Sequence, residues 1–167
     1  RRVPGYEPRQ RAGICRNGEG VARVMSSNAE QRLPPAILAK AVPTDSLEYG
    51  WREADFSDVI EAARRTPMAV VGGQIQYIFP DATCELYWLN YDPAERKPDE
   101  TWLSYCNRTA QECQELFVKI TSSANAEEEA VSSFDFLKVK VTEGVDIAAH
   151  KAFIIYFDDS ETDSYLK

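Results

Sequence analysis

Histidine is nearly absent from this chain. The only one among the 167 residues is His150. A Cys–His or Ser–His nucleophile pair would have to use it, and a catalytic metal usually needs several histidines or a tight group of carboxylates. No nucleophile-elbow motif stands elsewhere, and His150 lies at the edge of an expected strand. We therefore expect His150 to be a surface residue, and we expect no catalytic centre, no cofactor and no metal.

Cysteine is also scarce, and its spacing does not indicate a metal motif. The four cysteines are Cys15, Cys84, Cys106 and Cys113, and no two have Cys-x-x-Cys spacing. Cys106 and Cys113 fall in an expected helix, where a rise of about 1.5 Å per residue separates them by roughly 10 Å, too far for a disulfide. We expect both to be buried free thiols in a reducing, cytoplasmic compartment. A bond between Cys15 and Cys84 stays open as an alternative.

No apolar run approaches the roughly 20 residues that cross a bilayer, so a membrane is not expected as a partner. The formal net charge is −8. This argues against a nucleic-acid binder, because such proteins need a basic surface. The charge is uneven, since residues 1–24 hold six arginines against two glutamates. The rest of the chain is therefore more acidic than the total and suits a basic partner.

The central stretch, residues 68–91, reads as a β-hairpin. Two runs rich in β-branched and aromatic residues flank a turn at Pro80 and Asp81. Because alternate residues of a strand face opposite sides, one face should enter the core and the other is either covered by a helix of the chain or used to bind a partner. The expected core set is Ile75, Tyr77, Phe79, Cys84, Leu86 and Trp88, and the other set is Gln74, Gln76, Ile78, Glu85, Tyr87 and Leu89.

The pair Gly72-Gly73 lies inside the first run of this hairpin. No Gly-x-Gly-x-x-Gly pattern surrounds it and no helix is expected directly after it, so a phosphate-binding loop is not indicated. We expect a bulge or a close backbone approach at this point.

Periodic apolar residues predict two main helices. Residues 55–65 carry one apolar stripe, with Asp55 as the expected N-cap. Residues 100–121 form a longer helix, with Asp99 as the expected cap. The stripe of the first helix is Phe56, Val59, Ile60 and Ala63, and that of the second is Trp102, Cys106, Cys113, Leu116, Phe117 and Ile120.

The remaining segments complete an α+β domain over residues 33–167, preceded by a loosely ordered basic arm over residues 1–32. A short helix is expected over 33–42, a loop or short helical turn over 122–133, and strands over 134–142 and 152–157. Short connections between paired strands favour an antiparallel sheet of about four to five strands, with the two main helices packed on it.

Acidic residues follow the expected strand ends, where a single antiparallel sheet could gather them on one side. Interleaved with tyrosines, they would suit a basic protein through electrostatic steering and aromatic anchors; the alternative is that they are ordinary solubilising charges. The expected partner-binding residues are Glu85, Tyr87, Tyr91, Asp92, Glu95, Asp158, Asp159, Glu161 and Asp163.

The hairpin segments Val70–Tyr77 and Cys84–Asp92, in a small acidic α+β chain, resemble those of the immunity proteins that bacteria pair with polymorphic or type VI secreted toxins. The resemblance lies in architecture and charge over residues 45–160, and the basic arm departs from it. It implies an inhibitor that binds a cognate toxin, such as a nuclease, without a cofactor. Two alternatives stay open: a small hydrolase using paired carboxylates, and an adaptor that self-associates through a sheet edge.

Overall fold

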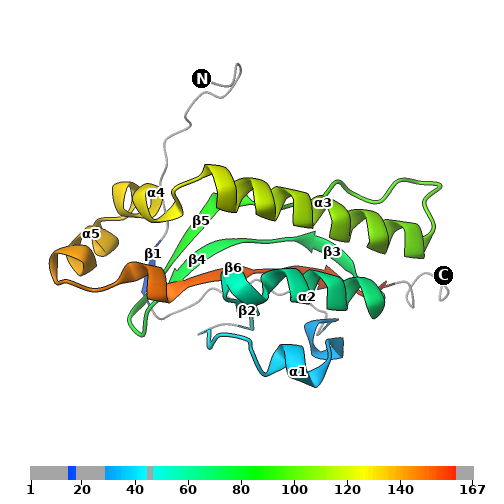
Figure 1. The fold of residues 1–167 in the computed structure, drawn as a ribbon, viewed down its shortest axis with the longest axis horizontal. Coiled ribbons are helices and arrows are strands. Elements are labelled where there is room, and N and C mark those ends of the chain that lie inside the picture. Colours follow the sequence, from blue (N-terminus) through cyan, green and yellow to red (C-terminus); the bar gives the residue numbers. More distant parts are fainter. Residues whose placement is uncertain (1–14, 18–28, 45–46, 161–167) are drawn as a thin grey trace, which may run out of the picture.

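The computed structural model describes residues 15–17, 29–44 and 47–160, and the expected α+β class is confirmed. A five-stranded antiparallel sheet has the order β1-β5-β4-β6-β2, and β3 and β7 form a two-stranded sheet. Helices α2 and α3 lie along the same face of the strands (Figure 1). The strands are β1 (Cys15–Asn17), β2 (Gly50–Trp51), β3 (Ala69–Gly72), β4 (Gln74–Ile78), β5 (Ala82–Asn90), β6 (Lys151–Ile154) and β7 (Tyr156–Asp158).

The two sheets are joined by one long antiparallel ribbon. Its pairing runs from Ala69 opposite Asp158 to Tyr77 opposite Lys151, with a register shift beside Gly72. At Gly73 the chains approach so closely that a Cβ atom would lie 1.9 Å from the carbonyl oxygen of Ile154. The bulge and the close backbone approach expected at Gly72-Gly73 are both confirmed.

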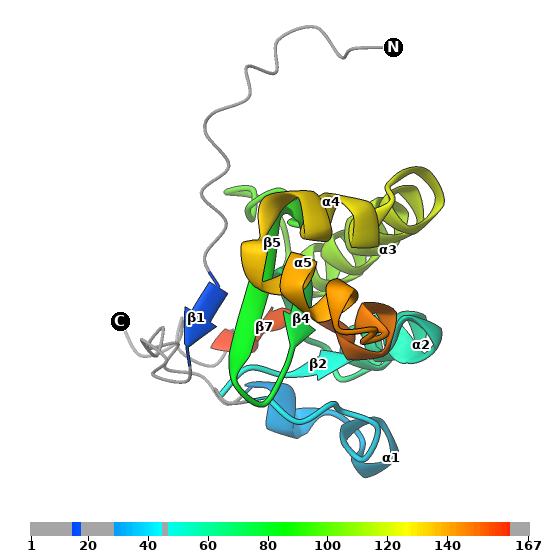
Figure 2. The ribbon, with the colours of Figure 1, turned by 90° about the vertical axis from the view of Figure 1, so that its left-hand side faces the viewer.

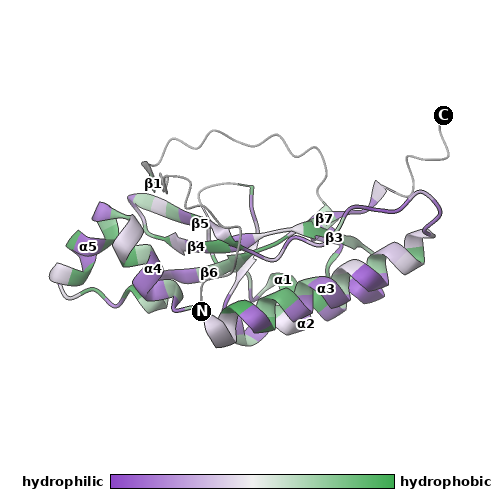
Figure 3. Cartoon of the chain, turned by 90° about the horizontal axis from the view of Figure 1, so that it is seen from above, coloured by the Kyte–Doolittle hydropathy of each residue, from purple (hydrophilic) through white to green (hydrophobic). Residues whose placement is uncertain are grey.

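The two main helices are α2 (Glu53–Arg65) and α3 (Trp102–Ser123), and their expected stripes face the core. Both are amphipathic, with hydrophobic and hydrophilic residues around the same helix (Figure 3). The expected N-caps are wrong. Arg52 precedes α2, so Asp55 lies in its first turn, and Thr101 caps α3 by accepting from Ser104 N at 3.2 Å.

Between these helices and the sheet lies an aromatic core. The ring of Phe56 is 5.0 Å from that of Tyr91, 4.8 Å from that of Phe117 and 5.3 Å from that of Phe153, measured between centroids. These contacts join α2, α3, β6 and the end of β5, so burial of the apolar stripes holds the layers together.

Strand β5 changes phase near its end. Ile75 pairs with Leu86 but the preceding Gln74 pairs with Asn90, so β5 carries extra residues at this point. Strict alternation over the hairpin is therefore wrong beyond Leu86. Leu89 turns inward and is only 9% exposed, whereas Trp88, expected in the core, is half-buried.

Residues 134–142, expected as a strand, form helix α5 (Asp135–Thr142). The alternation of valine and lysine there resembles a strand pattern, but Val139 and Val141 are exposed and only Leu137 of this helix is buried. Lys138 pairs with Asp135 one turn earlier, a contact that helical spacing provides. Of the two alternatives for 122–133 the helical one holds, as α4 (Ala126–Ser133).

Three short helical elements complete the chain. The expected short helix over 33–42 is α1 (Pro35–Leu38), and single 3-10 turns form η1 (Ala29–Arg32) and η2 (Ile147–His150). Helices α2, α3, α4 and α5 lie on one face of the sheet, and β1 forms one of its edges (Figure 2). No helix within the described ranges is long and apolar enough to cross a membrane.

Cys15 and Cys84 are joined by a disulfide between β1 and β5, the alternative that the sequence left open. Cys106 and Cys113 are buried free thiols, as expected.

The expected basic arm, residues 1–32, is only partly described, since 1–14 and 18–28 lie outside the described residues. The two pieces that are described belong to the fold. β1 pairs with β5, and Ala29 of η1 is fully buried in the hydrophobic core. The packed fold therefore begins earlier than residue 33.

Candidate functional site

Four of the expected partner-binding residues lie at one end of the ribbon. Strands β5 and β7 are both antiparallel to the β3–β4 segment, so they run in the same direction; β5 ends opposite Gln74, and β7 ends further along, opposite Ala69. Asp92 and Glu95 follow β5, and Asp158 and Asp159 stand at the end of β7. This end of the sheet, near the start of α3, lies toward the C-terminus in Figure 1. We call these four residues the acidic end.

The loop that carries Glu95 is held by Arg108 of α3. Its guanidinium contacts Glu100 (Nε to Oε1, 2.7 Å) and Glu112 (3.0 Å), and it donates to the carbonyl oxygens of Ala94 (3.1 Å) and Glu95 (3.0 Å). These hydrogen bonds lower the pKa of Glu100 to about 2 and raise that of Arg108. A bidentate, charge-assisted contact of this kind fixes the loop in one arrangement.

Aromatic rings connect this loop to β7. Arg96 lies 5.5 Å from the ring of Trp102 and 5.9 Å from that of Tyr105. Burial, and next the charge of Asp158, raise the pKa of Tyr105. The Tyr105 ring thus lies near Arg96 of the loop, and its hydroxyl is close enough to Asp158 to respond to that charge.

Tyr91 is not a surface residue, contrary to the expectation. It is fully buried, and its hydroxyl shares a hydrogen bond between the carbonyl oxygens of Gln74, at 3.0 Å, and Ile154. Asp92 beside it is exposed and accepts a hydrogen bond from Gly73 N at 3.0 Å. Tyr91 anchors the point where β5 leaves the ribbon and thereby sets where Asp92 emerges.

Within the acidic end, Asp159 pairs with Arg32 at 3.3 Å. The remaining predicted residues are not part of this end. Glu161 and Asp163 lie outside the described residues. Glu85 and Tyr87 are on β5, on the face of the sheet turned away from α3, so they are not part of the acidic end. Tyr87 is 48% exposed, and Glu85 stands opposite Gln76.

That sheet face carries a polar cluster that the sequence analysis missed. Glu48, from the segment before β2, contacts Gln76 Nε2 at 3.2 Å and accepts from the hydroxyl of Tyr156. Burial, and next the hydrogen bond to Glu48, raise the pKa of Tyr156. The residues come from three distant segments, so their spacing gave no signal.

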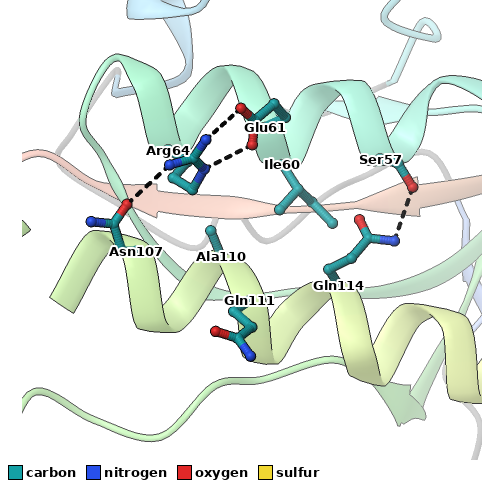
Figure 4. Close-up of a pocket in the computed structure, with 8 residues that line it drawn as sticks. All are labelled: Ser57, Ile60, Glu61, Arg64, Asn107, Ala110, Gln111 and Gln114. Atoms are coloured by element: carbon teal, nitrogen blue, oxygen red, sulfur yellow. Dashed lines mark hydrogen bonds and ion pairs between the residues drawn. The ribbon is translucent and has the colours of Figure 1, made fainter. Parts of the chain in front are cut away.

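A hollow of about 390 Å³ lies between α2 and α3 (Figure 4). Arg64 spans it at one end, 3.4 Å from Asn107, and Gln114 reaches Ser57 at the other, at 3.0 Å. Its polar side chains form hydrogen bonds between the two helices, so they connect α2 to α3 at the surface.

A second hollow, of about 220 Å³, lies where the start of α2, the end of α3 and the start of α4 meet the sheet. Lys151 contacts Glu127 at 2.8 Å and Glu53 at 3.5 Å. We call it the Lys151 pocket. Its lining is Glu53, Ile75, Ile120, Thr121, Ala124, Asn125, Ala126, Glu127, Lys151 and Phe153.

Two carboxylates, Glu53 and Glu127, come together in the Lys151 pocket. This bears on the alternative of a glycoside hydrolase, which needs such a pair. Burial acts to raise the pKa of Glu127, but hydrogen bonds, led by the one from Lys151, outweigh it and the pKa is lowered. Hydrolysis by paired carboxylates needs one carboxyl kept protonated by a raised pKa. Glu127 is ionised instead, so this arrangement favours ion pairing and binding over proton donation by that residue.

His150 is packed more than expected. It is half-buried, its Nδ1 lies 3.0 Å from the carbonyl oxygen of Ile78, and its ring stacks on Phe79 with 4.0 Å between centroids. In the described part of the chain no three histidine, cysteine or carboxylate side chains form a group that could hold a metal ion.

Comparison with known proteins gives no match to any family model, curated protein or solved structure.

Proposed function

We propose that this chain is a protein-binding domain, an immunity-type inhibitor that neutralises a bacterial toxin, with a nuclease as the favoured toxin class. The observation that carries the proposal is the acidic end. Asp92 and Glu95 come from one segment and Asp158 and Asp159 from another more than sixty residues later, yet β5 and β7 both run toward the same end of the ribbon. A nuclease presents basic groups to its substrate, and such groups suit this surface.

The rigidity of the acidic end supports binding by a preformed surface. Arg108 holds the loop at Ala94 and Glu95, and Gly73 N holds Asp92. A surface that is ordered before the encounter loses less conformational entropy on binding. The acidic charge also steers a basic partner during diffusion, and salt screens this attraction.

The disulfide bears on where such an inhibitor would act. Cys15 and Cys84 are joined, and disulfides persist mainly in oxidising compartments. In such a compartment the bond would hold β1 on β5 while the inhibitor meets its toxin.

Co-expression with the product of the neighbouring gene tests the proposal. We expect a stable complex, relief of toxicity, and an affinity that falls as salt is added. The triple variant Asp92→Asn, Glu95→Gln and Asp158→Asn should weaken binding by at least tenfold. Asp135→Asn on α5, whose side chain is 95% exposed, is the matched control and should bind normally. No complex, or an affinity indifferent to salt and to the triple variant, would overturn the proposal.

A further inference from the structure

Strand β1 is the one described piece of the chain before η1, and a covalent bond joins it to the sheet. Among the described strands its three residues, Cys15–Asn17, pair only with Ala82–Cys84 of β5, and Cys15 stands directly opposite Cys84. The disulfide joins this same pair of cysteines. The bond and the strand pairing therefore act together on one short edge of the five-stranded sheet.

Hydrogen bonds alone give β1 little stability on this edge. Phe79 N donates to the carbonyl oxygen of Ala82 at 2.8 Å, so the backbone groups of Ala82 and Cys84 point to β4. Those of Thr83, which lies between them, point to β1 instead. Ordering the backbone of one residue costs at least as much free energy as one hydrogen bond returns. A three-residue strand therefore depends on the covalent bond to keep its position.

The rest of β5 is held without β1. The strand pairs with β4 on its other side, and at the turn Phe79 donates to Ala82 and stacks on the ring of His150, with 4.0 Å between centroids. The next described residue after β1 is Ala29, which is fully buried in the core. Loss of β1 would leave both the β4–β5 hairpin and the anchor at Ala29 in place.

We propose that the Cys15–Cys84 disulfide is a redox switch that a dithiol reductant opens. Cys15 is half-buried and Cys84 is fully buried, so the reductant approaches from the Cys15 side. A thiolate of the reductant bonds to Cys15 Sγ, the S–S bond breaks, and Cys84 leaves and takes up a proton. The second thiol of the reductant then displaces Cys15 as a free thiol. Two electrons and two protons pass to the protein, and the reductant becomes a disulfide.

Opening the bond uncovers the start of β5. Once β1 leaves, the backbone groups of Thr83 lose their partner strand, and Ala82–Cys84 becomes an unprotected edge of the kind that native sheets usually cover. Cys106 and Cys113 are buried in α3, so they do not exchange with the two released thiols. The switch acts at this edge of the sheet, and it is independent of the acidic end and of any toxin.

Alkylation and amide hydrogen exchange of the folded native chain test this inference. In dithiothreitol, a dithiol, we expect iodoacetamide to label Cys15 while the far-ultraviolet circular dichroism stays native. The Thr83 amide should then exchange about a hundredfold faster, at the rate of an unstructured peptide, whereas the Cys84 amide, which points to β4, stays protected. Cys106→Ala should behave as the native chain does, because its thiol is not part of the bond.

Cys15→Ala separates the release of the strand from the chemistry of reduction. This variant keeps Cys84 in the core and lacks the bond, so its Thr83 amide should exchange fast with or without dithiothreitol. A disulfide that dithiothreitol leaves intact until the chain is denatured would overturn the inference. Continued protection of Thr83 in the reduced native chain would overturn it too, and so would the loss of protection at Cys84 together with Thr83.

Discussion

Arg108 Nε lies 2.7 Å from Oε1 of Glu100, and the two side chains are 19% and 7% exposed. The contact joins the first half of α3 to the loop that leads into it. The same guanidinium holds the carbonyl oxygens of Ala94 and Glu95. One arginine therefore decides the shape of the loop that forms half of the acidic end.

This contact predicts acid sensitivity. The pKa of Glu100 falls from 4.5 to about 2 on folding, chiefly through the hydrogen bond from Arg108. Because the pKa is lower in the folded state, the contact contributes its full stability when the pH is above the unfolded-state pKa. This contribution is lost as the pH falls from about 4.5 toward 2. Urea unfolding at several pH values should show Glu100→Gln flattening the decline in this window. Glu115→Gln, exposed on α3, should leave the decline unchanged, and a steep native-like decline in Glu100→Gln would contradict the prediction.

Gly73→Ala should destabilise the fold by more than about 3 kcal/mol, because the new Cβ would meet the ribbon backbone. That atom would lie 1.9 Å from the Ile154 carbonyl oxygen and 2.6 Å from the Tyr91 ring. Gly144→Ala is the control. Its φ is +82° but no atom lies within 4 Å, so we expect a cost of about 1–2 kcal/mol. Similar losses in the two variants, measured by chemical denaturation, would contradict the close approach.

Reduction of the disulfide should lower stability by about 4 kcal/mol. Cys15 and Cys84 are 69 residues apart, and breaking a bond that closes a loop of this length increases the conformational entropy of the unfolded chain. The double variant Cys15→Ala and Cys84→Ala should match the reduced native protein and ignore reductant. A chain with Cys106→Ala, a buried free thiol, should still respond to reductant. A melting temperature that reductant does not change would contradict this prediction.

Tyr77→Phe should raise the free energy of unfolding by up to about 1 kcal/mol. The variant keeps the ring and removes a buried hydroxyl that has no partner at ordinary hydrogen-bond geometry and lies near the Glu127 carboxylate, and such a group costs stability. Thermal and urea unfolding measure the effect. Tyr156→Phe is the control, since its hydroxyl is bonded to Glu48, and it should lose stability. A loss of more than 1 kcal/mol in Tyr77→Phe would show that its hydroxyl has a partner.

The sequence predicted well the elements whose pattern and burial agree. The stripe through Phe56 and Ile60 marked α2, and the turn at Pro80 marked the hairpin. The prediction was wrong for α5, because Val139 and Val141 alternate like strand residues although they face solvent. An alternation of apolar and polar residues therefore predicts a strand correctly only where the apolar residues are the ones that become buried.

The candidate sites were less accessible to sequence reasoning. Grouping the acids after β5 and β7 needed only strand direction, which the antiparallel prediction supplied. Tyr91 was misplaced because the phase change after Leu86 depends on how β5 pairs with β4. The Lys151 pocket joins Glu53, Glu127 and Lys151 from three distant segments, so only the folded chain brings them together.

The affinity of the co-expressed partner for the acidic end is the most direct test of the central claim. It should be measured for the native chain, for the triple variant at Asp92, Glu95 and Asp158, and for Asp135→Asn, at low and high salt. The account predicts tight binding that salt and the triple variant each weaken, with Asp135→Asn unchanged. Binding that survives the triple variant at all salt concentrations would contradict it.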